Sequence, residues 1–403
     1  MSLGALAGRR SDSGVRRGAV ASRDERRTSG LDGRIAGAAG FLVAMGIVMI
    51  YSATAPLAMG HTVPPHFVRH LIGVAGGLVL GALAMRVPLD LWRRWALPCW
   101  LLSVALLVLT ALVGVRVNGA RRWLVVPGTG LSFQPAELAK LATLLAVAAV
   151  LARHDGPVGR RLRDLVAPAL LAAIPAALLL LQPDLGNAAL ILVLCGLLVF
   201  LAGVPLRLML LPALLGAAGL AMYVTVRPYA LRRWVGFLHP WDTASSEGFQ
   251  LVQSFVAFGR GGLTGVGLGA GRQKLFYLPE AHTDFILSVV AEELGLVGVL
   301  LVLGAFAALL LGGLRVARRC GDRFALFVAF ALTMLLTLPA AMNAAVVTGL
   351  IPTKGLALPF LSYGRTQTVV CLVALGILLG IARRDASTSP HAAPVARRTW
   401  RLR

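Results

Sequence analysis

Ionisable and aromatic side chains are concentrated in residues 271–284 (GRQKLFYLPEAHTD), which lead directly into the apolar run 285–290 (FILSVV). Ionisable groups at the end of a strongly apolar segment are energetically costly, so they are a candidate functional site. The residue types suit proton transfer by a carboxylate and neutralisation of an anion by nearby cations.

Asp284 admits two interpretations. It could cap the helix that starts in the apolar run, as Asp commonly does. It could equally act as a general base, because a buried carboxylate near a membrane surface has a raised pKa unless cations compensate. The neighbouring Glu280, His282 and Lys274 favour catalysis, since a cap needs none of them.

A metal site is a weaker alternative for the same residues. Glu280, His282 and Asp284 share one face if the segment is extended, whereas in a helix only Glu280 and Asp284 do. A hydrogen-bonded loop is the favoured interpretation, and the sequence predicts no dedicated metal site.

Two further carboxylates, Glu292 and Glu293, lie two turns into the predicted helix, where an unpaired charge is expensive. Helical phase places Glu292 nearer than Glu293 to the face of Asp284. We interpret Glu293 as a protonated or paired carboxyl that holds helices together.

The glycine-rich run 259–271 has spacings like those of dinucleotide-binding loops, but it lacks a strand–helix context. It is better interpreted as non-helical backbone that folds back at the membrane surface. Its neighbourhood supplies three cations that could meet a phosphate: Arg260, Arg272 and Lys274.

Other cations lie in loops that face away from the arginine-rich side of the membrane. Arg121 and Arg122 precede Trp123, and Lys354 lies in a break between two spans. Each could be an interfacial anchor. A phosphate clamp is favoured for the arginines because outward arginines oppose the usual charge bias, and broken segments such as that of Lys354 often line binding cavities.

The composition identifies the class of protein that must position these residues. The chain has 403 residues, of which 58% are hydrophobic and 14% charged, whereas soluble domains have about 25% charged residues. The formal net charge is +22, but the arginines lie in the tails and short loops between apolar runs. This distribution indicates orientation in a membrane and argues against a nucleic-acid-binding face. The four cysteines show no paired spacing.

The apolar runs predict an all-α, polytopic membrane protein with ten transmembrane helices. Arginines cluster in the even-numbered loops and in both tails, so the positive-inside rule predicts cytoplasmic termini. Residues 1–33 and 385–403 are predicted to be basic tails, the first disordered, on either side of a membrane domain over 34–384. The long loop 227–284 is predicted to be extracytoplasmic and to form short interfacial helices and re-entrant segments over a cavity. The predicted spans are 35–53, 68–86, 95–115, 136–152, 165–182, 187–204, 206–226, 285–314, 324–349 and 366–382.

Six segments together resemble the SEDS family of shape, elongation, division and sporulation proteins, and its division branch more than its elongation branch. The resemblance implies a fold of ten transmembrane helices and a peptidoglycan glycosyltransferase that polymerises lipid II at the inner membrane of the division septum. It also implies a class B penicillin-binding transpeptidase of the FtsI type and other division proteins as partners. The segments are 118–123 (NGARRW), 134–140 (QPAELAK), 182–186 (QPDLG), 253–262 (QSFVAFGRGG), 278–285 (LPEAHTDF), and 352–356 (PTKGL) with 361–364 (LSYG).

The resemblance also implies roles for individual residues. The family's essential aspartate falls on Asp284, its functional arginine on Arg122 and its Pro-Thr-Lys-Gly lysine on Lys354. Residues 365–367 (RTQ) depart from the family's Gly-Ser-Ser. The full set predicted to bind the substrate or its pyrophosphate is Arg122, Lys354, Arg260, Lys274, Glu280, His282, Gln253, Lys140 and Glu137.

Asp284 would then deprotonate the sugar hydroxyl that attacks an anomeric carbon, while cations meet the leaving pyrophosphate. A divalent cation (Mg²⁺ or Mn²⁺) could share that task. Two other functions remain open: a lipid II flippase, which needs outward cations but no base, and a non-catalytic scaffold for division enzymes, which needs neither.

Overall fold

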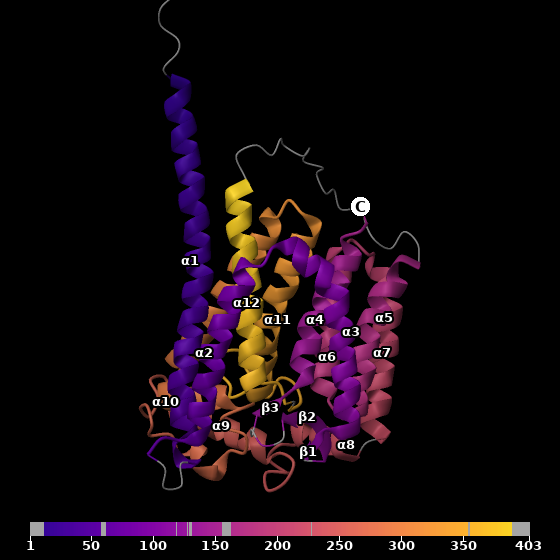
Figure 1. The fold of residues 1–403 in the computed structure, drawn as a ribbon. Coiled ribbons are helices and arrows are strands. Elements are labelled where there is room, and N and C mark those ends of the chain that lie inside the picture. Colours follow the sequence, from indigo (N-terminus) through magenta and orange to yellow (C-terminus); the bar gives the residue numbers. More distant parts are fainter. Residues whose placement is uncertain are drawn as a thin grey trace, which may run out of the picture.

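The computed structural model describes residues 12–57, 62–117, 119–126, 128, 131–154, 163–226, 228–353 and 355–388. Long helices lie side by side in one bundle (Figure 1). The helices are α1 (Asp12–Thr54), α2 (Pro65–Arg86), α3 (Leu89–Val113), α4 (Pro135–Leu151), α5 (Arg163–Leu181), α6 (Leu185–Leu201), α7 (Leu206–Val226), α8 (Pro228–Leu238), α9 (Phe249–Gly261), α10 (Ile286–Arg319), α11 (Arg323–Val347) and α12 (Arg365–Thr388), with a 3₁₀ turn η1 (Ala55–Leu57) and a π-turn η2 (Gln273–Tyr277).

The centre of the bundle is formed by α4, α11 and α12, whose side chains are largely buried. Around it, α1 packs on α10, α2 on α12 and α3 on α4. These outer helices expose many Leu and Val side chains, as expected where lipid replaces water. The all-α, polytopic class predicted from the sequence is confirmed.

Seven of the described helices are long and apolar enough to span a bilayer. Three more, α4, α6 and α7, occupy the positions of the remaining predicted spans, but α4 and α6 have only 17 residues each. The seven spans support a multi-pass membrane protein, while the count of ten stays a prediction.

Helix α1 begins at Asp12, inside the stretch 1–33 for which the sequence predicts a disordered tail. Arginine and alanine in this stretch favour helix, and the apolar segment that follows supplies a helix to extend. The helix projects beyond the ends of its neighbours (Figure 1). Residues 1–11 lie outside the described part of the chain.

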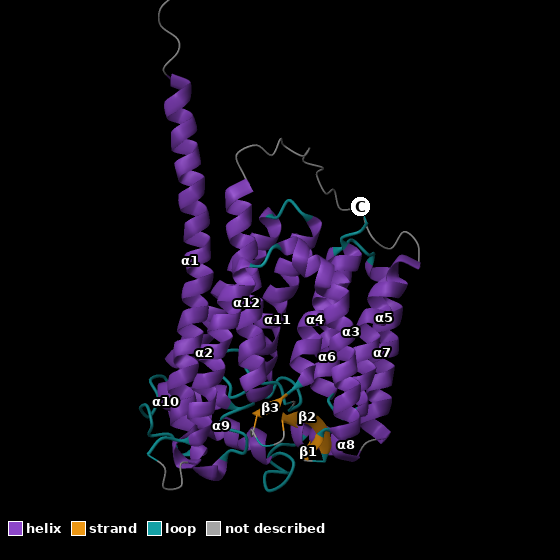
Figure 2. Ribbon diagram, in the orientation of Figure 1, coloured by secondary structure: helices purple, strands orange, loops and turns teal. Residues whose placement is uncertain are grey.

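The polar segments gather at one end of the bundle, where strands and loops lie beside α8 and α9 (Figure 2). The sequence analysis did not identify the three-stranded antiparallel sheet here, although its β-branched and aromatic residues favour strand. Its strands are β1 (Val115–Val117), β2 (Ala120–Val126) and β3 (Leu131–Phe133). The long loop contains α8, α9 and η2, as short helices were predicted there.

The glycine-rich run docks on a break in α10. Gly295 has φ 66° and ψ −165°, a conformation essentially confined to glycine. The break frees backbone groups for the run: Val266 N donates to Glu292 O at 3.0 Å, and Leu296 N donates to Gly262 O at 2.9 Å. Residues 262–267 thus fold back on α10 as non-helical backbone, as predicted, whereas residues 259–261 form the end of α9. Their location at the membrane surface stays a prediction.

Candidate functional site

Asp284 lies in the connection between η2 and α10, where it is half-buried. The helix begins at Ile286 behind Phe285, and no side chain caps it. Of the two interpretations offered by the sequence, helix capping is therefore wrong for Asp284. The carboxylate is instead free of the backbone amides of α10.

The connection is held by the segment that joins α11 to α12. Asn343 of α11 donates from Nδ2 to Asp284 O at 2.6 Å and to Leu356 O at 2.9 Å. Tyr363 N donates to His282 O at 2.8 Å, and Ser362 Oγ donates to Thr283 O. A methyl group added to Gly355 would lie 3.0 Å from Asp284 Oδ2, so the carboxylate lies against this backbone. These bonds position the carboxylate without neutralising it.

The surroundings of Asp284 set its protonation. Burial is the largest effect on the pKa of its carboxyl and raises it. The nearby carboxylate of Glu280 and, more weakly, Asp184 also raise it, while Arg233 and Arg122 lower it, and together these effects bring the pKa to about 7. A carboxyl with a pKa near neutrality can both accept and release a proton under physiological conditions.

Arg122 reaches the site from β2. Its Nε donates to Gln182 O at 3.3 Å, and Nη2 donates to Pro183 O, so the guanidinium ties β2 to the α5–α6 connection. Its neighbour Arg121 points elsewhere and donates to Leu112 O at the end of α3. The two adjacent arginines therefore differ. Arg121 is bonded to the end of α3, whereas the charge of Arg122 lowers the pKa of Asp284.

The sequence analysis missed two charged residues at this site. Arg233 of α8 donates from Nη1 to Thr353 O at 3.1 Å, and Asp184 caps α6 by accepting from Asn187 N at 3.3 Å. Both carried a signal, since Arg233 belongs to an outward arginine pair with Arg232 and Asp184 lies in the quoted segment 182–186. Lys354 lies outside the described residues, but its neighbours Thr353 and Gly355 border the site.

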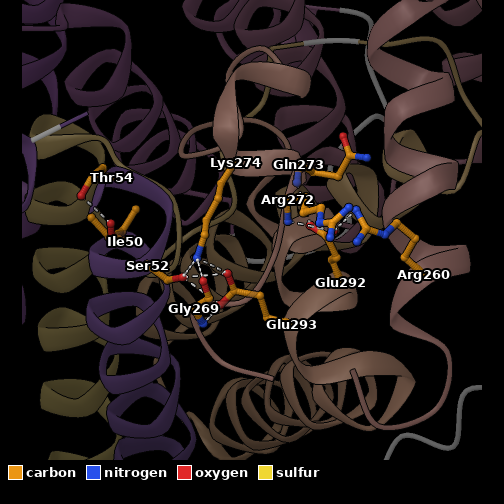
Figure 3. Close-up of polar contacts among 10 residues, drawn as sticks. All are labelled: Ile50, Ser52, Thr54, Arg260, Gly269, Arg272, Gln273, Lys274, Glu292 and Glu293. Carbon is orange, nitrogen blue, oxygen red and sulfur yellow. Dashed lines mark hydrogen bonds and ion pairs between the residues drawn. The ribbon is translucent and has the colours of Figure 1, made fainter. Parts of the chain in front are cut away.

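Arg260 and Lys274, predicted to bind pyrophosphate, are already paired with buried glutamates (Figure 3). Lys274 Nζ lies 2.6 Å from Glu293 Oε1 and also donates to Ser52 Oγ at 2.7 Å. Arg260 Nη1 lies 3.2 Å from Glu292 Oε1. Both glutamates are fully buried. The paired role predicted for Glu293 is confirmed, and Glu292 adopts the same role although helical phase placed it toward Asp284.

Backbone amides also donate hydrogen bonds to the two glutamates. Glu292 accepts from Arg272 N and Gln273 N, each at 3.0 Å, and Glu293 accepts from Gly269 N at 3.0 Å. These hydrogen bonds are needed because a buried carboxylate without donors strongly destabilises the fold. Arg260 and Lys274 therefore serve a structural cluster in this structure, and the cations that lower the pKa of Asp284 among the described residues are Arg233 and Arg122.

Glu137 and Lys140 form a second buried pair. Lys140 Nζ lies 2.7 Å from Glu137 Oε1, one turn apart at the start of α4. Gln253 is half-buried on α9. The structure thus gives Glu137 and Lys140 each other as partners, and their predicted contact with substrate stays a prediction, as does that of Gln253.

His282 and Glu280 flank Asp284 differently. The ring of His282 packs among those of His66 of α2, at 5.9 Å between centroids, and Tyr363, at 5.7 Å. Burial lowers the pKa of His282, which favours the neutral imidazole. Glu280 has φ 58°, an uncommon left-handed conformation, and its carboxylate accepts from Thr283 Oγ1 at 2.8 Å.

The three residues that depart from the family pattern all make bonds. Arg365 Nη2 donates to Ser132 Oγ at 2.8 Å, Gln134 N donates to Thr366 Oγ1 at 3.1 Å, and Gln367 Nε2 donates to Ala357 O at 2.9 Å. They join the start of α12 to the sheet, to α4 and to the segment beside Asp284.

Metal binding finds little support in this arrangement. Within the described ranges, no three carboxylate, imidazole or thiol side chains gather closely enough to hold an ion. The metal-ligand alternative for Glu280, His282 and Asp284 therefore gains no support.

The whole membrane region is similar to known proteins. The family model of the FtsW, RodA and SpoVE cell cycle proteins matches residues 35–387. A protein of Coxiella burnetii named probable peptidoglycan glycosyltransferase FtsW is 40% identical over 348 residues, which cover 85% of this chain and 93% of the relative. A Geobacter metallireducens protein with the same name is 42% identical over 351 residues, covering 86% and 93%.

Solved structures agree with the sequence relatives. A peptidoglycan synthase complex, described as coordinating polymerization and crosslinking, contains a chain with a TM-score of 0.71 and 31% identity, covering 87% of this chain and 97% of that one. The rod shape determining protein RodA of Thermus thermophilus has a TM-score of 0.65 and 30% identity, covering 88% and 97%.

The buried Lys274–Glu293 pair generates a stability prediction. Lys274→Met leaves Glu293 buried and unpaired, so it should lower the free energy of unfolding by about 3–5 kcal/mol. Lys274→Met combined with Glu293→Gln removes both charges and should recover most of that loss. Arg232→Met, which breaks the exposed pair with Glu247, is the control and should change stability by about 1 kcal/mol or less. Denaturant unfolding in detergent measures all three.

A Lys274→Met protein of unchanged stability that had lost only activity would contradict this structural role. It would instead return Lys274 to the substrate site.

Proposed function

This chain belongs to the FtsW, RodA and SpoVE family of cell cycle proteins, and we propose that it is a peptidoglycan glycosyltransferase that polymerises lipid II into glycan strands during division. The observation that carries the proposal is Asp284, a half-buried carboxyl with a pKa of about 7. It is fixed through its backbone, and the charges of Arg233 and Arg122 act on it. Glu292 and Glu293, the other carboxylates near the start of α10, are instead held in ion pairs.

The reaction joins two lipid-linked sugars. Asp284 takes the proton of the acceptor's 4-hydroxyl as that oxygen attacks the anomeric carbon of the donor. The new C–O bond forms as the bond to the lipid pyrophosphate breaks, and the pyrophosphate leaves with the bonding electron pair. Attack opposite to the leaving group inverts the anomeric centre. Asp284 then returns the proton to water.

The leaving pyrophosphate needs positive charge where its own charge develops. Arg122 and Arg233 are the described cations that act on Asp284, and both are held by backbone carbonyls from other segments. Fixed guanidinium groups suit this task because they bind phosphate oxygens in a two-pronged geometry. We assign the leaving group to these arginines, with Lys354 as a third cation. A divalent cation, Mg²⁺ or Mn²⁺, could bind the pyrophosphate itself.

The partner and the location follow the family. We propose a class B penicillin-binding transpeptidase of the FtsI type as partner, together with other division membrane proteins, because a structural relative belongs to a complex that couples polymerization to crosslinking. We place the protein in the inner membrane at the division septum, with both termini cytoplasmic and the Asp284 end of the bundle outside.

Asp284→Asn tests the proposed base. The purified variant, with its partner, should form no glycan polymer from lipid II. It should be at least as stable as wild type, because a carboxyl whose pKa is raised on folding destabilises the folded state once it ionises. Asp242→Asn, at an exposed position in the same loop, is the control and should polymerise normally.

The pH profile of the wild type adds an independent check. A base must be deprotonated to act, so kcat/KM should rise as pH increases through about 7 and level off above it. Near-normal polymer from Asp284→Asn would remove the base assignment. Lipid II transfer across the bilayer without any polymer from the wild type would favour a flippase.

The arginines generate a separate prediction. Arg122→Ala and Arg233→Ala should each lower the rate of polymerisation per folded molecule about ten- to a hundredfold. This corresponds to the loss of one charge-assisted hydrogen bond, which contributes roughly 1.5–3 kcal/mol. Arg122→Lys should recover only part, since a point charge cannot make a two-pronged contact. Arg232→Ala, on the same helix but paired with Glu247, is the control. Stability is measured alongside, and variants that lose stability but keep activity per folded molecule would make these arginines anchors.

Orientation is tested by labelling. A cysteine at Ser246, exposed near α9, should react with an impermeant thiol reagent added to spheroplasts, whereas one at Gly321, exposed between α10 and α11, should not. The reverse pattern would place Asp284 in the cytoplasm and overturn the proposed site of polymerisation.

A further inference from the structure

A groove of about 590 Å³ runs between α1 and α10 on the outside of the bundle. It lies along the second half of α10, far from Asp284: from Ile286 to Arg315 the helix rises roughly 44 Å at about 1.5 Å per residue. Its floor is the close packing of α1 on Gly312, where an added methyl group would lie 2.6 Å from Ile35 Cγ1. The groove therefore belongs to a different part of the molecule from the candidate catalytic site.

The walls of the groove are apolar and small at the centre. On α10, Gly304 and Ala308 lie one turn apart and line it, and a methyl group added to Gly304 would meet nothing within 4 Å. Phe41 of α1 and Leu301 of α10 also line it, and Leu301 is 54% exposed. The surface is thus an open apolar channel rather than a packed helix contact.

Two arginines close one end of the groove. Arg34 of α1 and Arg315 of α10 both line it and both are exposed. Neither takes part in a salt bridge within the described parts of the chain. Two cations at the end of an apolar channel are complementary to a ligand with a phosphate at one end and a hydrocarbon tail.

The length of the groove discriminates between two occupants. From Leu301 to Arg315 the channel extends roughly 21 Å along the helix. One leaflet has about 15 Å of hydrocarbon plus its headgroup, whereas a spanning helix needs about 30 Å of apolar surface. The dimension and the charge at one end fit a single lipid in one leaflet better than a partner's transmembrane helix.

We propose that this groove is a binding site for an anionic phospholipid. The phosphate binds between Arg34 and Arg315, and one acyl chain lies along Gly304 and Ala308 toward Phe41. Bound in this way, the lipid joins α1 to α10, the helix that starts beside Asp284. The proposal does not rest on glycan polymerisation.

Native mass spectrometry of the purified protein with added phosphatidylglycerol or phosphatidylcholine tests the site. The wild type should bind phosphatidylglycerol more tightly. Arg34→Gln with Arg315→Gln should weaken that binding by about tenfold or more, because each arginine supplies a charge-assisted bond to the phosphate. The matched control, Arg318→Gln with Arg319→Gln, removes two exposed charges from the same end of α10 outside the groove and should bind as wild type.

A second pair of variants tests the acyl channel. Gly304→Leu fills the open space and should reduce phosphatidylglycerol binding as strongly as the arginine changes. Gly40→Leu, at an exposed position of α1 that does not line the groove, should have no effect. Thermal unfolding without added lipid should be unchanged in all four variants, which shows that they fold.

Four results would overturn the proposal. Equal binding of the two lipids by the wild type, or equal losses in the two double-arginine variants, would reduce the effect to general surface charge. Full phosphatidylglycerol binding by Gly304→Leu would remove the acyl chain from the groove. If the Gly304→Leu variant no longer bound a partner's transmembrane segment but still bound phosphatidylglycerol, the occupant of the groove would be a helix.

Discussion

The two buried glutamates of α10 impose the constraint on which the site depends. Glu292 and Glu293 lie where no water can solvate them, so donors must come from elsewhere in the chain. The backbone amide of Gly269, in the glycine-rich run, donates to Glu293, and the amides of Arg272 and Gln273, just after the run, donate to Glu292. Lys274 and Arg260 supply the positive charge. The break at Gly295 lets the run approach. From the docked run, the chain leads through η2 to the start of α10.

Asp284 lies just before α10, and its environment differs from that of Glu292 and Glu293 because no ion pair within the described residues neutralises it. Its carboxylate lies against backbone at Gly355 and near the like charge of Glu280, and burial raises its pKa to about 7. Arg122 and Arg233 oppose that rise without cancelling it. The carboxylates in this region therefore have different roles. Glu292 and Glu293 in α10 are neutralised by ion pairs and stabilise the fold, whereas Asp284, just before α10, can still bind a proton.

The two ends of the bundle differ in chemistry because the chain distributes its polar segments unequally. The sheet, α8, α9 and the segment 351–364 gather at the Asp284 end, where many backbone groups bond across elements (Figure 2). Toward the other end, the apolar part of α1 begins at about Arg34 and that of α10 ends at about Arg315, and both arginines line the groove. One end is therefore suited to polar, phosphate-bearing substrates, and the other to lipid.

The sequence by itself determined the membrane class, the positions of the long helices and the candidacy of Asp284. These depend on local composition and on short motifs, which the chain carries wherever it folds. Only the tertiary structure decided how charges pair. Ser52 and Glu293 are 241 residues apart yet hydrogen-bonded, and Arg233 joins the site from a helix that the motifs did not mark. Lys274 was predicted to bind substrate because the sequence shows its charge but does not show that Glu293 is its partner. A buried ion pair is fixed by packing between distant segments, and sequence spacing does not record it.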